Sequence, residues 1–258
     1  MMNRITAAIA GVAIAMTTMA GALAADPLKI GISAEPYPPF TYKSSGGEWN
    51  GFEVELAGAL CERIERECTI TPTGWDGIIP ALNSGKIDII MNSMSITEKR
   101  DRVIDFTDPY YYTAGAYVGN EDMEISIPEG LDGKILGVQG ATTHANFARA
   151  ALADTGVEVK IYNKQEQANR DLQAGRVDLI LADEIAMQAF LQRDDIAGYE
   201  IKAKTPKHEA YGEGIGIGVR DGDDELTKEL NKAIQAVLEN GTCTELSKQY
   251  FGADICGA

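Results

Sequence analysis

A run of polar side chains in residues 91–100, MNSMSITEKR, follows the apolar segment GKIDII. Ser93 and Ser95 supply hydroxyl groups, and Arg100 supplies a guanidinium that can bind a carboxylate through two hydrogen bonds. A helix that begins near Thr97 would add free backbone N–H groups, which attract anions. The segment therefore predicts a site for a small carboxylate. The alternative is a capped helix with Arg100 in a surface ion pair.

A second group of candidate residues is spread along the rest of the chain. Thr142 and Thr143, in GVQGATTHANF, could cap a helix and form another anion-binding turn. Asp183 ends a predicted strand, where its carboxylate would suit an ammonium group, unless it caps the following helix instead. Tyr37 and Trp75 lie on predicted loops and could stack on a flat or cationic side chain, or simply anchor those loops. A carboxylate clamp, an ammonium acceptor and aromatic walls together describe a site for an α-amino acid.

The elements that must position these residues follow an α/β pattern. LKIGISA (28–34) and CTITPT (68–73) are predicted strands, and residues 51–66 between them have the apolar spacing of an amphipathic helix. A short helix over residues 75–85 then leads into the buried strand KIDIIM (86–91). Strands that alternate with helices indicate parallel pairing and an open α/β sheet.

An internal echo extends this pattern to a second half of the chain. ALNSGKIDIIMNSMS (81–95) and DLQAGRVDLILADEI (171–185) share the same order of apolar residues, glycine and aspartate. In each copy a glycine, Gly85 or Gly175, is expected to end a helix, and an aspartate three residues later to begin a strand. Two copies predict two similar lobes. Because open α/β sheets bind ligands at the carboxyl ends of their strands, the polar residues after both strands are expected to face each other across a cleft.

Two features of the C-terminal part complete the predicted elements. The glycines of YGEGIGIGVR (211–220) could be mistaken for a phosphate-binding loop, but no strand-to-helix pattern and no suitably placed lysine accompany them. A strand that returns between the lobes is the better interpretation. Residues 223–251 then predict one amphipathic helix.

The N-terminus and the overall charge restrict the compartment and the partners. Residues 1–24 combine Arg4, a short apolar stretch and a small-residue site ending at Ala24, which is typical of a cleavable signal peptide. The apolar stretch is too short and too rich in Ala and Thr for a good membrane anchor, and no cysteine near the cleavage point could carry a lipid. We expect a soluble exported protein. The net charge of −16 argues against binding to nucleic acid or to anionic lipid surfaces.

The four cysteines all follow the predicted cleavage site, so they would meet an oxidising compartment. Four cysteines allow three pairings, and the local one, Cys61–Cys68 with Cys243–Cys256, closes two short loops. A metal site is the rival interpretation. It is disfavoured because the chain has no C-x-x-C motif and no histidine close in sequence, so no metal is predicted.

Taken in order, the motifs resemble one family along the whole chain after the signal peptide. The chain resembles the periplasmic polar amino-acid-binding proteins of ATP-driven importers, which include the lysine/arginine/ornithine and histidine receptors. The resemblance is carried by YPPF, GFEVELAGALC, IIPALNSGKIDIIMNSMSITEKR, FTDPYY, GVQGATTHANF, DLQAGRVDLILADE and GIGIGVR.

This resemblance implies a domain plan. The fold would be an α/β periplasmic-binding-protein fold of type II, with two lobes and a ligand cleft between them. Residues 25–112 and 216–258 would form the first lobe, and residues 117–209 the second. The hinge strands would cover residues 112–117 and 209–216. The Cys61–Cys68 pair matches a disulfide of the lysine and histidine receptors, whereas Cys243–Cys256 rests on the cysteine count alone.

The resemblance also implies how the backbone groups of an amino acid would be bound. Arg100 would bind the α-carboxylate, with help from Ser95 and from the turn formed by Thr142 and Thr143. Asp183 would bind the α-ammonium group.

The remaining roles concern the ammonium side and the ligand side chain. Ser93 would lie near the ammonium group, and Tyr37 and Trp75 would flank the side chain. Basic amino-acid receptors carry an acidic residue shortly before the tyrosine, and Glu35 occurs here in a slightly shifted register. His144 replaces a polar amide of the family.

The implied function is capture of a polar, cationic L-amino acid (arginine, lysine, ornithine or histidine) and its delivery to an inner-membrane ABC permease. We expect a monomer without cofactor, membrane insertion or catalytic activity. One alternative is a receptor for a neutral polar amino acid or an opine. Another is an exported cyclohexadienyl dehydratase on the same fold, for which Glu35, Glu184 and His144 are candidate acids, although the sequence contains no evident acid–base pair.

Overall fold

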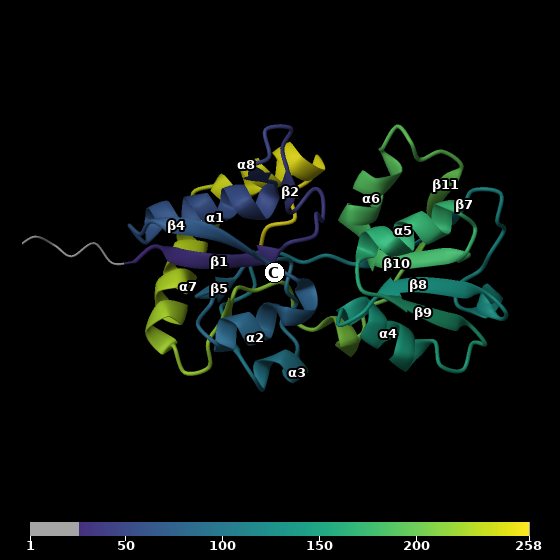
Figure 1. Ribbon diagram of the computed structural model, residues 1–258, viewed down its shortest axis with the longest axis horizontal. Coiled ribbons are helices and arrows are strands. Elements are labelled where there is room, and N and C mark those ends of the chain that lie inside the picture. Colours follow the sequence, from purple (N-terminus) through teal and green to yellow (C-terminus); the bar gives the residue numbers. More distant parts are fainter. Residues whose placement is uncertain (1–25, 258) are drawn as a thin grey trace, which may run out of the picture.

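The computed structural model describes residues 26–257, so the predicted signal peptide (1–24) lies outside the described part of the chain. Strands alternate with helices and form two separate five-stranded sheets. The two sheets lie in opposite halves of the molecule, each with its own covering helices (Figure 1). The predicted α/β fold with two lobes is confirmed.

The first sheet, with the order β4-β1-β5-β12-β6, defines lobe 1. β1 is parallel to β4 and β5, whereas β12 is antiparallel to both β5 and β6. The chain leaves this sheet after β6 and returns to it only at β12. The strands are β1 (Leu28–Ser33), β4 (Cys68–Thr73), β5 (Ile89–Ile90), β6 (Asp105–Phe106) and β12 (Gly218–Val219).

Helices cover both faces of the lobe 1 sheet, with α1 and α8 on one side and α2 and α3 on the other (Figure 1). Leu28, Ile30 and Ile32 of β1 are no more than 2% exposed and belong to the core shared with α1 and α7. The helices are α1 (Phe52–Arg63), η1 (Trp75–Gly77), α2 (Ile78–Asn83), α3 (Glu98–Asp101), α7 (Asp224–Glu239) and α8 (Thr242–Phe251). A hairpin of β2 (Tyr42–Lys43) and β3 (Trp49–Asn50) completes the lobe.

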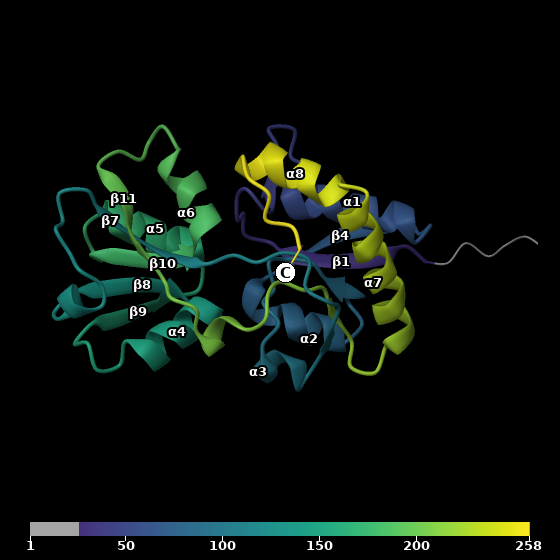
Figure 2. The ribbon, with the colours of Figure 1, turned by 180° about the vertical axis from the view of Figure 1, so that it is seen from behind.

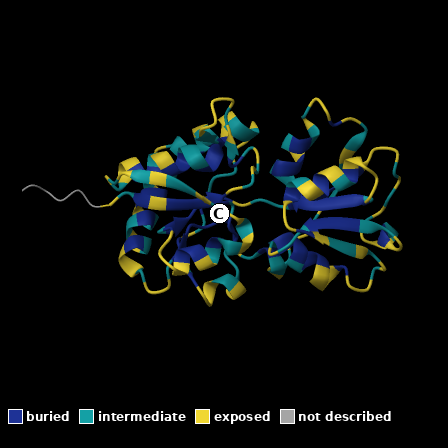
Figure 3. Ribbon diagram, viewed as in Figure 1, coloured by how far each residue is buried: buried dark blue, intermediate teal, exposed yellow. Residues whose placement is uncertain are grey.

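The second sheet, with the order β11-β7-β10-β8-β9, defines lobe 2. Its central strands are buried, whereas exposed positions lie on the outer faces of the helices and on loops (Figure 3). The strands are β7 (Gly115–Asn120), β8 (Ile135–Gln139), β9 (Glu158–Tyr162), β10 (Leu179–Asp183) and β11 (Tyr199–Lys204). The helices are η2 (Glu129–Leu131), α4 (Thr143–Ala151), α5 (Gln165–Gln173), α6 (Glu184–Leu191) and η3 (Glu209–Tyr211).

The internal echo of the sequence is a structural repeat. Gly85 and Gly175 have φ angles of 72° and 65° just after α2 and α5, where a left-handed residue ends a helix. Asp88 accepts a hydrogen bond from the backbone N–H of a β1 residue at 3.0 Å, and Asp178 accepts one from Ile135 of β8 at 2.8 Å. Each aspartate thus ties its own strand to the neighbouring strand, and both strands run toward the middle of the molecule.

The expectation of one helix over residues 223–251 is wrong. The segment forms α7 and α8, separated at Gly241. Gly241 has a φ angle of 84°, which a helix interior does not allow, and the side chain of Asn240 accepts a hydrogen bond from the Thr242 N–H at 2.9 Å. The break lets the two helices pack against each other and both against α1.

Two segments connect the lobes, one between β6 and β7 and the other between β11 and β12 (Figure 2). The segments lie side by side, because the Ile215 N–H donates to the Tyr111 carbonyl at 2.9 Å and the Ile215 carbonyl accepts from the Tyr110 N–H at 2.9 Å. The second segment is not a continuous strand as expected, since residues 209–211 form η3 and the His208 side chain caps it. Their role as hinges stays a prediction.

Both predicted disulfides are present, Cys61–Cys68 and Cys243–Cys256. Within residues 26–257, no helix has the length and apolarity needed to cross a membrane. The same residues contain no cluster of metal-binding side chains.

Candidate functional site

A cavity of about 290 Å³ lies between the lobes, at the carboxyl ends of β1, β5, β8 and β10. All ten residues predicted to bind the ligand line it: Glu35, Tyr37, Trp75, Ser93, Ser95, Arg100, Thr142, Thr143, His144 and Asp183. A larger and more open hollow of about 970 Å³, beside α7 and the start of β1, contains none of them. The structure therefore brings the predicted residues together in one enclosed place.

Arg100 reaches this cavity from the short helix α3. The helix begins after Thr97 as predicted, and Thr97 caps it by accepting a hydrogen bond from the Arg100 N–H, as the alternative interpretation expected. The guanidinium donates to the Ser95 carbonyl at 2.8 Å and, across the lobes, to the Ala141 carbonyl at 3.3 Å. Burial lowers the pKa of Arg100 to about 10, so the side chain keeps its charge at neutral pH. Within residues 26–257 it has no carboxylate within 4.0 Å, so the surface ion pair considered from the sequence is not formed.

Trp75 lines the cavity and also contacts Arg100. Its ring faces the guanidinium of Arg100, with 5.4 Å between the guanidinium carbon and the ring centroid. The ring therefore supports the cation, and its expected contact with a ligand side chain stays a prediction. Its indole nitrogen is buried without a hydrogen-bond partner among the described residues.

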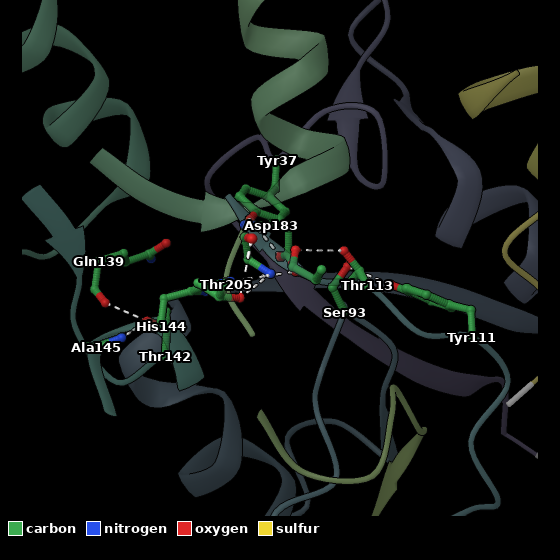
Figure 4. Close-up of polar contacts among 12 residues, drawn as sticks. Tyr37, Ser93, Tyr111, Thr113, Gln139, Thr142, His144, Ala145, Asp183 and Thr205 are labelled. Atoms are coloured by element: carbon green, nitrogen blue, oxygen red, sulfur yellow. Dashed lines mark hydrogen bonds and ion pairs between the residues drawn. The ribbon is translucent and has the colours of Figure 1, made fainter. Parts of the chain in front are cut away.

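Asp183 ends β10, and its side chain is 13% exposed. The alternative role as a helix cap is excluded, because the carboxylate makes no capping hydrogen bond to α6. The Tyr37 hydroxyl, from lobe 1, donates to this carboxylate at 2.7 Å (Figure 4). Burial first and the charge of Asp183 second raise the pKa of Tyr37 well above its usual value, so the phenol stays protonated and donates. The carboxylate thus faces the cavity with a contact that spans the lobes.

His144 lies beside Asp183 in the first turn of α4. Its Nε2 is 3.8 Å from the carboxylate and has no hydrogen-bond partner in the described part of the chain. The residue is 6% exposed, and burial lowers its pKa, an effect that Asp183 opposes and Arg100 reinforces. A neutral imidazole with a free nitrogen in a polar cavity is a group that a ligand can satisfy.

The predicted turn at Thr142 and Thr143 is present at the start of α4. The Thr142 side chain accepts from the Ala145 N–H at 3.1 Å and donates to the Gln139 carbonyl at 2.7 Å (Figure 4). Thr143 is 5% exposed and begins the helix. The turn is therefore a rigid part of the cavity wall, held by the cap.

Glu35 and Lys164 come from different lobes and form an ion pair in the lining of the cavity. Lys164 Nζ lies 3.0 Å from Glu35 Oε1, and the Ser33 hydroxyl donates to the same carboxylate at 2.9 Å. Burial alone would raise the pKa of Glu35, but the hydrogen bonds from Lys164 and Ser33 lower it below its usual value. The carboxylate is therefore ionised and already paired.

Sequence reasoning missed part of the cavity lining. Asn92 lies two residues after β5 and Gln139 ends β8, so the rule that ligands bind at strand ends would have found both. The residues on α5 gave no comparable signal, because they lie on a helix with an ordinary surface composition. The missed polar residues are Ser33, Asn92, Gln139, Lys164, Gln165, Glu166 and Arg170.

Comparisons with known proteins agree with this geometry. Residues 28–253 match the model for bacterial extracellular solute-binding proteins, family 3. The chain is 41% identical over 235 residues to an L-arginine-binding protein of Pseudomonas aeruginosa, covering 90% of each chain. It is 39% identical over 249 residues to the histidine-binding periplasmic protein of Escherichia coli, covering 95% of each. The solved structure of an ancestral arginine-binding protein bound to arginine superposes with a TM-score of 0.82 at 35% identity, covering 89% of this chain and all of that one.

Proposed function

Because the chain belongs to the bacterial extracellular solute-binding proteins of family 3, we propose that it captures a cationic L-amino acid in the periplasm and delivers it to an ABC permease. Arginine, lysine, ornithine and histidine form the ligand class. The observation that carries this proposal is a cavity with an unpaired guanidinium from lobe 1 and a carboxylate from lobe 2. An α-amino acid has the complementary pair of charges.

Arg100 binds the α-carboxylate in this proposal. A guanidinium has five N–H donors, and the two hydrogen bonds to backbone carbonyls leave the others for a ligand. The face of Trp75 and the backbone contacts fix its direction before a ligand arrives, which reduces the entropy lost on binding. Ser95 and the turn at Thr142 and Thr143 form the adjacent wall.

Asp183 binds the α-ammonium group, with Ser93 beside it. The ammonium group would approach the carboxylate where the Tyr37 hydroxyl and the His144 nitrogen already meet. A neutral His144 could accept a hydrogen bond from the same ammonium group. Burial of the ammonium and carboxylate together avoids leaving either charge unpaired.

Glu35 binds the cationic end of the ligand side chain. Its carboxylate is ionised and pairs with Lys164, whose side chain is half exposed. Exposed ion pairs are weak, so a ligand cation inside the cavity can displace or share this contact. Capture without turnover fits these contacts, and we propose no catalytic role for the residues of the cavity.

A thermal-shift screen against all twenty amino acids, ornithine and opines tests the function. A ligand that binds only the folded protein stabilises it by about 2.7 kcal/mol at a hundredfold excess over its Kd. We expect the largest increases in Tm with arginine, lysine, ornithine or histidine. The largest increase with glutamine or an opine would overturn the ligand class, and no increase with any compound would overturn the function.

The substitution Glu35→Gln tests the cationic class directly. It removes the charge that faces the ligand side chain, so affinity for arginine or lysine should fall at least about tenfold, while glutamine affinity stays the same. Glu166→Gln, on the opposite wall of the cavity, is the control, because Glu166 pairs with Arg170 and Arg193 of its own lobe. Calorimetry that finds equal losses for arginine and glutamine would argue against the assignment of Glu35.

A further inference from the structure

A buried carboxylate lies behind the cavity and forms no ion pair with the residues that the structure describes. Glu53, on α1, is 1% exposed and does not line the cavity. Its Oε1 accepts hydrogen bonds from the Tyr110 hydroxyl at 2.6 Å and from the Tyr111 hydroxyl at 2.8 Å. Its Oε2 accepts one from the Ser93 N–H at 2.8 Å. Burial of a carboxylate costs free energy unless hydrogen bonds satisfy it, and these three donors supply them.

Ser93 connects this network to the cavity. It has a φ angle of 49°, in the left-handed region that serine seldom adopts. Its hydroxyl lies 2.8 Å from the Tyr111 hydroxyl, which itself contacts Glu53 (Figure 4). The backbone hydrogen bond to Glu53 holds the strained conformation, and the phenol holds the side chain. Ser93 is therefore fixed from two sides by one carboxylate.

The number of hydroxyl hydrogens decides which oxygen donates and which accepts in this network. A phenol has one hydrogen, and burial together with the charge of Glu53 keeps Tyr111 protonated by raising its pKa well above the usual value. Burial raises the pKa of the Glu53 carboxyl, and its three hydrogen-bond donors, Tyr110, Tyr111 and the Ser93 N–H, oppose this effect. When Glu53 is ionised it takes the one hydrogen of Tyr111, and the phenol oxygen is left to accept from the Ser93 hydroxyl. The hydrogen of Ser93 thus points toward Tyr111, and the lone pairs of its hydroxyl are left for the cavity.

We propose that Glu53 is a positioning residue for ligand binding, which acts through Tyr111 to make the Ser93 hydroxyl an acceptor for the ligand ammonium group. This inference rests on the proposed function, because it assigns the ammonium group to the side of the cavity formed by Asp183 and Ser93. A serine hydroxyl that was free to rotate could instead present its hydrogen and repel the ammonium group. Glu53 prevents this rotation of the Ser93 hydroxyl without contacting the ligand.

Two tyrosine substitutions separate this role from a contribution to folding. Tyr110 and Tyr111 are both buried and both donate to Oε1 of Glu53, but only Tyr111 reaches Ser93. Tyr111→Phe should weaken binding of L-arginine, L-lysine, L-histidine or L-glutamine, whichever the wild type binds, by about tenfold. Tyr110→Phe should change that affinity less than about twofold, although it removes an equivalent hydrogen bond. Equal effects of the two substitutions would overturn the proposal.

A double-mutant cycle with Glu53→Gln and Ser93→Ala measures the coupling. Glu53→Gln should weaken binding at least about tenfold in the wild type and less than about threefold when Ser93 is already alanine. Glu62→Gln, at an exposed position of α1, is the control and should leave affinity unchanged. If Glu53→Gln fails to fold, the tyrosine pair decides the question.

The outcomes distinguish this inference from the proposed function. Equal losses from Glu53→Gln in both backgrounds mean that the carboxylate supports the fold alone, which overturns the inference. A wild type that binds none of the four amino acids contradicts the proposed function and this inference together. Binding by the wild type with no difference among the variants contradicts the inference alone.

Discussion

Arg100 and Asp183 carry opposite charges into the cavity and form no ion pair with each other. Arg100 donates two hydrogen bonds to backbone carbonyls. Asp183 accepts one from the Tyr37 phenol and lies beside the imidazole of His144. A buried charge with incomplete pairing costs free energy in the empty protein, so such an arrangement is typical of a binding site. The side chains that surround each charge fix its position in advance.

Replacement of Arg100 by alanine tests the carboxylate assignment. We expect Arg100→Ala to abolish binding of every amino acid that the wild type binds, since a hydrogen bond to a charged group contributes about 1.5–3 kcal/mol and the ligand carboxylate would be buried without a partner. Arg102→Ala is the control, because Arg102 is exposed and pairs only with Glu98 among the described residues. Near-wild-type affinity of Arg100→Ala in calorimetry would end the assignment.

His144 gives the free protein a specific pH dependence. Burial lowers the pKa of His144 below 6.5. Below that pH the histidine binds a proton in the unfolded chain but stays neutral in the folded protein. Stability is then lost as the pH falls from 6.5 through the lowered pKa. His144→Gln should remove this part of the loss in urea unfolding at pH 7.5 and 5.5 without added amino acid. The charges of Asp183 and Arg100, which act on the imidazole, are present in both proteins. An equal loss of stability in both would contradict the prediction.

At the scale of elements, the two disulfides secure parts that lie away from the cavity. Cys61–Cys68 joins α1 to β4, and Cys243–Cys256 joins α8 to the C-terminal segment. That segment reaches back to the first connection, where Tyr111 pairs with Cys256 in an isolated bridge. None of the four cysteines lines the cavity. The crosslinks therefore support lobe 1 without contact to a ligand.

Removal of each crosslink should cost stability in proportion to the loop it closes. Chain entropy predicts a loss of about 3 kcal/mol for Cys243→Ser/Cys256→Ser and somewhat less for Cys61→Ser/Cys68→Ser, because the second loop is shorter. Ligand affinity should change little in both variants. Urea unfolding and calorimetry check the two parts. A large loss of affinity without a loss of stability would show that a disulfide shapes the cavity.

At the scale of the whole molecule, polar contacts hold the lobes together around the cavity. Tyr37 meets Asp183, Arg100 meets the Ala141 carbonyl, and Glu35 meets Lys164. Each contact adds only a modest free energy, because its groups exchange water for protein partners. The closed arrangement is therefore easily shifted by a ligand that binds both lobes.

Loss of the Tyr37 hydroxyl should shift the free protein toward an open form. Tyr37→Phe removes a contact worth about 1 kcal/mol, which changes the ratio of closed to open molecules about fivefold. Small-angle X-ray scattering should give a larger radius of gyration for the free variant than for the free wild type, and saturating amino acid should remove the difference. Tyr199→Phe is the control, since that hydroxyl binds the Leu172 carbonyl within lobe 2. Equal radii of the free variant and the free wild type would contradict the prediction.

Local sequence patterns determined the elements and most of the residues of the cavity. The glycine and aspartate of each echo copy fix a helix end and a strand start through backbone geometry and one hydrogen bond, so both strand ends could be predicted together with Ser93 and Asp183. The pattern over residues 223–251 was misread, because apolar periodicity continues through Gly241 and only the backbone angle there ends the helix.

Only the tertiary structure decided which groups face each other. Glu35 pairs with Lys164, Trp75 faces Arg100, and Glu53 is bound to Ser93 forty residues away. The first contact depends on how the two lobes meet and the other two on packing within lobe 1, and no spacing in the sequence encodes either. The sequence by itself therefore determined the chemical types that form the cavity, whereas their pairing and the direction of their hydrogen bonds come from packing within and between the lobes.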